Sequence, residues 1–273
     1  AAARNAGERY AASSVLSSGK WVRIAVKENG VHKITNRELA SMGFKNPEKV
    51  RLYGYGGHIL PETGIENLPD DLQEVPLWRE TGYKLFYANG TVKWAYESGR
   101  FKHTNNVYSN YGCYFLTEND GPAAEFPSET VAEKPQATLT EFPDYLLHEK
   151  EEYSHCSYGR VLVESYNYAQ GRSVSYRFNA SGIVGGTGVV DVSFATNGAD
   201  LSRVDVVAGG KSVGTLSVPS CSSGEVGKLV SSRFAITGGM ADNPVVKLSQ
   251  STANSSVTGY LDYIRLNFTR TLA

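Results

Sequence analysis

The sequence predicts a mainly β protein: an N-terminal β-rich domain with one short helix, followed by an antiparallel β-sandwich that is jelly-roll-like. Composition is the first reason, because the 273 residues include 17 tyrosines and 28 glycines but only 20% charged residues, as is typical of strands joined by many turns. Periodicity is the second reason. Short runs that alternate apolar and polar residues recur through the second half, separated by glycine and serine turns and by no long helical pattern.

Two β-hairpins are expected in the first half. Residues 21–26 alternate as a strand does, and the turn residues 28–30 separate them from a partner run at 31–34. The dipeptide Asn89-Gly90 readily takes the positive φ angles of a tight turn, so we expect a second hairpin around it. Strands are predicted at residues 49–53, 82–87, 91–96 and 111–116.

One short helix is expected after the first hairpin. Thr35 and Glu38 have the Thr-x-x-Glu spacing of a capping box, which marks a helix N-terminus. Leu39 and Met42 then supply an apolar face, and Gly43 fits the position where the helix ends.

A glycine-rich stretch, Gly54-Tyr55-Gly56-Gly57, raises the question of phosphate binding. A P-loop needs the spacing GxxxxGK[ST], and a dinucleotide-binding loop needs GxGxxG before a long helix. This stretch has neither spacing, and residues 182–188 fail the same test between two predicted strands. We therefore expect a strand end followed by a turn.

Residues 119–143 change the character of the chain. Four prolines and several acidic residues interrupt any core-forming period there, which indicates a long connection. We place the domain boundary at its end, giving a flexible tail at residues 1–12, a β-rich domain at 13–140 and a sandwich at 141–273. In the sandwich, the apolar positions that alternate along the expected strands are Val174, Tyr176, Phe178, Val190, Val192, Phe194, Val204, Val206, Leu216, Val218, Phe234, Ile236, Val246, Leu248, Ile264, Leu266 and Phe268.

Net charge and hydropathy argue against two classes of partner. The formal net charge is −1, so there is no basic field to bind nucleic acid or an anionic membrane. No apolar run approaches the ~20 residues that a membrane-spanning helix needs. The small, polar N-terminal residues are typical of a mature or truncated chain, which leaves room for an absent secretion signal.

Three cysteines, Cys113, Cys156 and Cys221, lie outside any zinc-binding CxxC spacing. One disulfide with one free thiol, and three buried thiols, are both compatible with that count. A catalytic cysteine needs a partner histidine, and His148 and His155 lie close to Cys156 in sequence. If that segment is extended, His155 and Cys156 point to opposite faces and do not pair, so we favour a packed thiol beside a surface histidine.

Metal binding has little support. His148 and His155 lack a third ligand at a suitable spacing, and Asp70-Asp71 predicts a solvated turn, with calcium binding as the alternative. We therefore assign no catalytic, cofactor-binding or metal-binding residue. The remaining histidines are scattered along the chain: His32, His58 and His103.

Aromatic residues are the unusual resource of this chain. Trp21, Trp78, Trp94 and many tyrosines could line a groove for a sugar or a peptide. Most of them fall on alternating strand positions, where packing explains them without a ligand. Paired carboxylates for glycoside hydrolysis are not assignable from the sequence.

Several separate stretches carry a family resemblance. They are residues 14–26, 31–44, 46–57, Asp70-Asp71-Leu72, 74–76, 85–96, 103–118 and 144–153. In this order they resemble the non-catalytic N-terminal region of the type IX secretion system sortase PorU and its relatives, the gingipain-type (C25) cysteine peptidases of the Bacteroidota cell surface. The resemblance covers most of residues 13–160 and, more loosely, the sandwich that ends in GYLDYIRLNFTR.

The resemblance implies a function without catalysis. In that family the catalytic histidine and cysteine lie in a domain that follows the matched region, so no catalytic residue is carried over and the chain is not expected to be an enzyme. It implies a secreted or outer-membrane-associated accessory region that positions the peptidase domain or contacts cargo or envelope proteins. The alternative is a surface carbohydrate-binding module, favoured by the predicted sandwich and the tyrosine and tryptophan content; a free-standing hydrolase has the least support.

Overall fold

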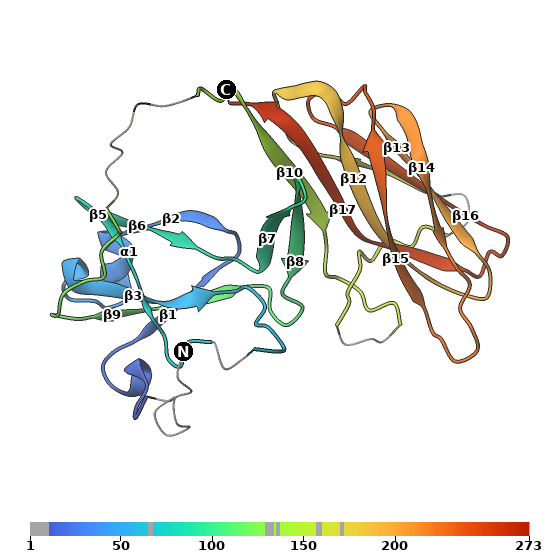
Figure 1. Ribbon diagram of the computed structural model, residues 1–273. Coiled ribbons are helices and arrows are strands. Elements are labelled where there is room, and N and C mark those ends of the chain that lie inside the picture. Colours follow the sequence, from blue (N-terminus) through green and yellow to red (C-terminus); the bar gives the residue numbers. More distant parts are fainter. Residues whose placement is uncertain are drawn as a thin grey trace. The chain divides into compact units, whose positions relative to one another are not determined.

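The computed structural model describes residues 11–64, 68–128, 134, 137–156, 160–169 and 172–272 (Figure 1). Within these ranges strands dominate, accompanied by the α-helix α1 and by short 3-10 helices. This confirms the mainly β prediction. No helix in the described part of the chain is long and apolar enough to cross a membrane. The expected tail lies outside the described residues apart from Ala11 and Ala12.

The chain divides into two compact units. The first comprises Ala1–Ala95 and Lys102–Glu133, and the second comprises Tyr96–Phe101 and Lys134–Ala273. The second unit therefore includes a short segment from the middle of the first half, which forms the tip of a hairpin. The domain limits expected from the sequence stay a prediction.

Short antiparallel sheets make up the first unit. Its strands and those of the hairpin are β1 (Val22–Val26), β2 (Gly30–Thr35), β3 (Val50–Gly56), β4 (Glu74–Val75), β5 (Trp78–Glu80), β6 (Tyr83–Ala88), β7 (Val92–Glu97), β8 (Arg100–Asn105) and β9 (Gly112–Glu118). One sheet has the order β1-β9-β3-β4, another has the order β2-β6-β5, and β7 pairs with β8. Apolar residues from these strands and from α1 form one buried cluster.

Both predicted hairpins are wrong, although their strands exist. β1 pairs with β9 and β2 pairs with β6, so the two strands leave the turn into different sheets. The Asn29 side chain does not close a tight turn: its amide oxygen accepts a hydrogen bond from Gly90 N (2.7 Å) and its Nδ2 donates to Val92 O (2.6 Å). Gly90 packs against the chain so closely that a Cβ there would lie 2.3 Å from Lys27 O. The two segments that were predicted to form separate turns are therefore hydrogen-bonded to each other.

Hairpins instead form where the sequence analysis did not place them. β5 pairs with β6, and β7 pairs with β8, a strand that the periodicity did not reveal. The β7–β8 turn is Ser98-Gly99, with φ angles of 51° and 78°. Positive φ at both central positions matches the twist of the flanking strands.

The helix α1 (Asn36–Ser41) confirms the capping prediction. The Thr35 hydroxyl accepts a hydrogen bond from Glu38 N (3.2 Å), and the Glu38 carboxylate accepts one from Thr35 N (2.7 Å). Leu39 is fully buried. Just beyond the helix, Gly43 has a φ of +85°, a left-handed conformation that ends a helix at little cost only in glycine.

The glycine-rich stretch at the end of β3 is a strand end, as expected, and its glycines serve close packing. A Cβ on Gly57 would lie 2.6 Å from the Gly112 Cα. Any side chain at Gly57 would therefore push two backbone segments apart. Crowding by protein backbone accounts for this glycine without a phosphate ligand.

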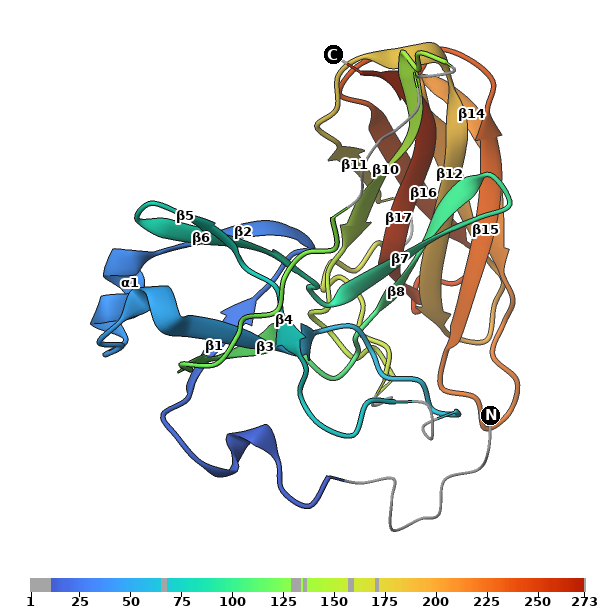
Figure 2. The same cartoon turned by 60° about the vertical axis from the view of Figure 1, so that its left-hand side comes forward.

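The second unit is an antiparallel β-sandwich. Its strands are β10 (Glu141–Glu149), β11 (Ser173–Arg177), β12 (Ile183–Asn197), β13 (Ser202–Ala208), β14 (Lys211–Val218), β15 (Lys228–Ile236), β16 (Val245–Thr252) and β17 (Thr258–Thr271). They form two four-stranded sheets with the orders β10-β17-β12-β15 and β11-β16-β13-β14, visible as two layers in Figures 1 and 2. The predicted sandwich is confirmed.

The alternating apolar positions predicted for the sandwich form its core. All are buried except Val174 and Phe234, which are half-buried and pack against it. Each buried valine or leucine contributes about 1.5–3 kcal/mol to folding. Two strand boundaries were missed: residues 182–188 are not a link between strands but largely the start of β12, and β10 contains Pro143. Pro143 is tolerated because β10 lies at the edge of the sheet β10-β17-β12-β15.

We expect Thr35→Ala to lower the stability of the first unit by about 1 kcal/mol, because the helix loses its N-terminal hydrogen bond. All three tryptophans lie in the first unit, so tryptophan fluorescence during urea unfolding reports this transition. Thr35→Ser keeps the hydroxyl and serves as the matched control. Equal losses from the two variants would contradict the assignment.

Candidate functional site

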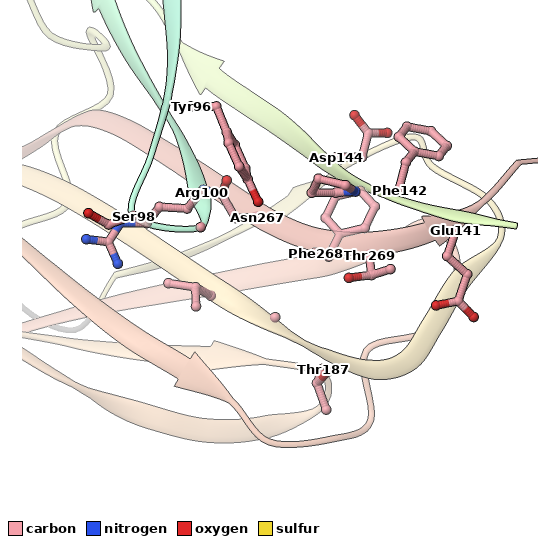
Figure 3. A pocket seen from close by; sticks show the side chains of 14 residues that line it. Tyr96, Ser98, Arg100, Glu141, Phe142, Asp144, Thr187, Asn267, Phe268 and Thr269 are labelled. Carbon is pink, nitrogen blue, oxygen red and sulfur yellow. The ribbon is translucent and has the colours of Figure 1, made fainter. Parts of the chain in front are cut away.

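A hollow of about 630 Å³ opens in the second unit beside the tip of the β7–β8 hairpin, over β10, β12 and β17 (Figure 3). Residues from four separate stretches of the chain line it: Tyr96, Ser98, Gly99, Arg100, Glu141, Phe142, Pro143, Asp144, Thr187, Gly188, Val189, Asn267, Phe268 and Thr269. Its volume falls within the range of small-ligand sites. No local sequence motif joins those stretches, so the hollow is not predictable from the sequence alone.

The Asn267 side chain holds the hairpin tip by forming the two backbone hydrogen bonds that a neighbouring strand would form. Asn267 Oδ1 accepts a hydrogen bond from Phe101 N (2.7 Å), and its Nδ2 donates to Phe101 O (3.2 Å). The Phe101 ring packs against Tyr145 at 4.5 Å and against Tyr96 at 4.9 Å, between ring centroids. Asn267 is buried, so this paired amide fixes the tip as one wall of the hollow.

Opposite charges lie at the two ends of the hollow (Figure 3). At one end is Arg100, whose Nε is shielded from solvent and which makes no hydrogen bond or ion pair with the described residues. At the other end is the exposed Glu141. The carboxylate of Asp144 is already engaged, because Arg270 Nη1 lies 3.0 Å from its Oδ2.

The described lining of this hollow combines charged groups with hydroxyl groups. Among the described residues that line it there is no cysteine, histidine or lysine. Of the two carboxylates in this lining, that of Asp144 forms an ion pair with Arg270. Hydroxyl groups of Ser98, Thr187 and Thr269 complete a polar lining.

His155 and Cys156 lie together, against the expectation for an extended strand. They occupy a turn, so the alternation rule does not apply, and both side chains border Gly227. Burial lowers the pKa of His155, and burial together with the Cys221 thiol raises the pKa of Cys156. The Cys156 thiol donates to Val226 O (3.1 Å). A nucleophilic cysteine needs the thiolate, and these shifts favour the thiol.

All three cysteines are free and half-buried. The alternative with one disulfide is therefore not what the structure shows. The structure agrees with the other possibility, three free thiols, except that the thiols are half-buried and not fully buried.

His148 belongs to a polar network around Glu164. Its Nε2 lies 3.2 Å from Glu164 Oε2, which also accepts a hydrogen bond from Tyr176 OH (3.0 Å). Lys150 Nζ donates to Glu164 Oε1 (2.7 Å), and the hydroxyls of Tyr168 and Tyr176 lie 2.6 Å apart. Burial acts to raise the pKa of Glu164, but the hydrogen bonds from Lys150, His148 and Tyr176 outweigh it and lower that pKa. The network ties the segment 160–169 to the sandwich.

One group of carboxylates has the chemistry of a hard-cation site. Ligand oxygens of Glu149, Glu151 and Asp262 lie within 4.8 Å of one another. Asp262 is the extra residue of a β-bulge in β17, where the register against β12 shifts after Ser193. Bulges re-aim side chains, which is why sequence spacing did not predict this group. Acidic groups often gather without an ion, so no metal is assigned to it.

Asp71 anchors the N-terminal segment through its carboxylate. Its carboxylate accepts hydrogen bonds from Val15 N (2.5 Å), Leu72 N (2.8 Å) and Ser14 Oγ (2.9 Å). The bonds from Val15, Leu72 and Ser14 lower the pKa of Asp71. Asp70 accepts from Ala11 N. These protein donors occupy the oxygens that calcium would need.

The three tryptophans lie in different surroundings. Trp21 and Trp94 pack against Tyr53 and His103, respectively. Trp78 instead lies on the exposed side of the sheet β2-β6-β5. The strand register puts it on the same side as Val31 and Tyr87, which are also exposed, and we call this side the aromatic sheet face. We define that face by Val31, Lys33, Trp78, Glu80, Tyr83, Leu85 and Tyr87.

Comparison with known proteins gives an extensive structural match to a PorU crystal structure. No family model and no curated protein sequence matches the chain. The crystal structure of dimeric latent PorU from Porphyromonas gingivalis is similar over 97% of this chain, with a TM-score of 0.82 and 26% sequence identity. This chain spans 25% of that PorU chain. The fold is therefore PorU-like over both units.

Two further solved structures are similar at low TM-scores. A family 35 carbohydrate-binding module from Cellvibrio japonicus has a TM-score of 0.32 and 15% identity over 47% of this chain and 97% of its own. An isomalto-dextranase from Arthrobacter globiformis has a TM-score of 0.29 and 11% identity over 90% of this chain and 34% of its own. Neither likeness carries an argument about function.

We expect the alkylation of native Cys156 by iodoacetamide to accelerate at a higher pH than alkylation of the same residue in the urea-unfolded chain. The reason is the raised pKa of the folded thiol. Peptide mass spectrometry separates Cys156 from Cys113 and Cys221 at each pH. A native midpoint at or below the unfolded one would show a stabilised thiolate and reopen the case for a nucleophile.

We expect Glu164→Gln to lower the stability of the second unit by about 1–3 kcal/mol at neutral pH. Because the folded pKa of Glu164 is lowered, its stabilisation is complete above the unfolded pKa and is lost as pH falls through the folded one. The variant should therefore lose less stability than the original chain on acidification below about pH 4.5.

Urea unfolding followed by far-ultraviolet circular dichroism measures this effect, with tryptophan fluorescence identifying the first unit's transition. Glu141→Gln is the matched control, since the Glu141 side chain is exposed and makes no hydrogen bond with the described residues. Identical acid profiles for Glu164→Gln and the original chain would refute the role of the network.

Proposed function

We propose that this chain is a non-catalytic accessory region of a secreted or surface gingipain-type cysteine peptidase that resembles the type IX secretion sortase. It positions the peptidase domain, or contacts cargo or envelope proteins, at the outer membrane of a Bacteroidota bacterium. The observation that carries the proposal is the match of both units to one PorU structure over 97% of this chain, while only 25% of that PorU chain is spanned.

The state of the His155 and Cys156 side chains supports a role without catalysis. Their pKa shifts favour a neutral imidazole and a protonated thiol, whereas cysteine peptidase chemistry needs a thiolate activated by its histidine. The described lining of the hollow beside the hairpin tip adds no cysteine and no histidine. The chemistry of a PorU-type protein would then belong to parts that this chain does not span.

The aromatic sheet face supports a role in docking. Val31, Trp78 and Tyr87 are 70%, 56% and 57% exposed, and they project from one side of a small sheet. Exposed apolar residues gathered on one face mark interaction sites more often than scattered ones do. Tryptophan and tyrosine are also the residues that most often dominate binding energy at such surfaces.

We expect the purified chain to bind the separately produced catalytic region of a PorU-type protein from the same organism. The double substitution Trp78→Ser and Tyr87→Ser should weaken this binding on the order of tenfold or more, because two aromatic anchors are lost. Biolayer interferometry measures the affinity. Tyr108→Ser is the matched control, since Tyr108 is 65% exposed and lies outside the aromatic sheet face.

Three outcomes would count against this proposal. Turnover of peptide substrates by the chain alone, abolished by Cys156→Ser, would make it a hydrolase. Binding to a polysaccharide panel without binding to the catalytic region would favour the carbohydrate-binding alternative. Equal weakening by the double variant and by Tyr108→Ser would remove the aromatic sheet face from the interaction.

A further inference from the structure

We propose that the hollow beside the β7–β8 tip binds a short zwitterionic peptide, with Arg100 holding a carboxylate and Glu141 holding an amine. This inference goes beyond the proposed function, because it concerns the second unit alone and does not depend on a peptidase partner. It rests on the charges, the open hydrogen-bonding groups and the fixed wall of the hollow.

Arg100 is the group that most needs a ligand. Its side chain is half-buried, its Nε is shielded from solvent, and it has no hydrogen-bond or ion-pair partner in the described residues. A partly desolvated charge without a partner is costly. A carboxylate is the planar anion that suits a guanidinium best, and the charge-assisted hydrogen bonds between them are strong.

Glu141 supplies the complementary charge for the other end of the ligand. Figure 3 shows Glu141 and Arg100 on opposite sides of the hollow. The remaining acid, Asp144, is neutralised by Arg270, so the hollow presents one open cation and one open anion. A ligand with separated opposite charges fits this pattern better than a purely anionic or neutral one.

The middle of the hollow suits the body of a peptide. The Tyr96 ring is 53% exposed and reaches over the hollow from the hairpin. The hydroxyls of Ser98, Thr187 and Thr269 make no hydrogen bond with the described residues, so they are available to peptide N–H and C=O groups. A volume of about 630 Å³ admits a peptide of only a few residues.

The wall that carries Arg100 is already in place before a ligand arrives. The neighbouring Phe101 is paired at both backbone atoms by Asn267 and packed against Tyr145. Binding therefore does not have to order the hairpin tip. Preorganisation of this kind reduces the entropic cost of binding.

Triglycine is the probe for this site, because it has both charges and no side chain. Titration into the ¹⁵N-labelled chain should give saturable shifts of the Ser98, Gly99, Thr187 and Gly188 amide signals. N-acetyl-triglycine, which lacks the amine, and triglycine amide, which lacks the carboxylate, should each bind several-fold more weakly. Glucuronic acid carries the carboxylate without the amine and tests an acidic sugar in the same assay.

Substitution separates the roles of the two charges. Arg100→Gln should weaken triglycine binding about tenfold, the loss expected for one charge-assisted hydrogen-bonding group, and should remove the difference between triglycine and its amide. Glu141→Gln should remove the difference between triglycine and its N-acetyl form. Arg177→Gln, at an exposed arginine on β11, is the matched control and should change neither.

Each other outcome overturns the proposal. No saturable shift with triglycine, or equal losses from Arg100→Gln and Arg177→Gln, would show that the hollow does not recognise a peptide through these charges. Saturation by glucuronic acid without a response to triglycine would assign the site to an acidic sugar instead. If Arg100→Gln does not fold, as judged by a poorly dispersed spectrum, the Glu141→Gln variant still tests the proposal. Its substitution is at an exposed residue, and the test compares its binding of triglycine with its binding of N-acetyl-triglycine.

Discussion

Antiparallel pairing along β17 is the interaction on which the second unit depends. This strand pairs with β10 on one side and with β12 on the other, so its backbone groups are satisfied while its side chains serve both faces. Ile264 and Leu266 point into the core, and Asn267, one position on, holds the hairpin tip outside it. The two-residue period of a strand thus places the stabilising residues and the residues of the hollow on the same short segment.

The sequence predicted the local parts of this fold well and its pairing poorly. Alternation in the sandwich depends only on which positions face the core, and the capping box at Thr35 depends on contacts three residues apart, so both could be predicted from the chain alone. The pairing of β1 with β9 depends on residues about ninety positions apart. Asn29 and Gly90 were both predicted to form tight turns, but Gly90 N instead donates a hydrogen bond to the Asn29 side chain. No local sequence rule predicts this long-range contact.

The candidate sites were harder to predict because they are assembled from distant segments. The hollow combines the tip at Ser98-Gly99 with strand ends from the sandwich, and the carboxylate group includes Asp262 only because a bulge turns that residue. For His155 and Cys156 the prediction was wrong for a different reason. It assumed an extended strand, in which neighbouring side chains point to opposite faces, but these two residues lie in a turn. What the sequence did convey was the resemblance to PorU and its relatives, which agrees with the PorU-like fold of this chain.

The bond between Phe101 and Asn267 closes a span of 166 positions along the chain, which affects the order in which this protein acquires its structure. Such long closures are entropically expensive and form late. During synthesis the aromatic tip leaves the ribosome well before the last strand exists to receive it. A nascent chain must therefore keep Tyr96 and Phe101 from associating with other hydrophobic surfaces for that interval, which makes this tip a point where a chaperone would be useful.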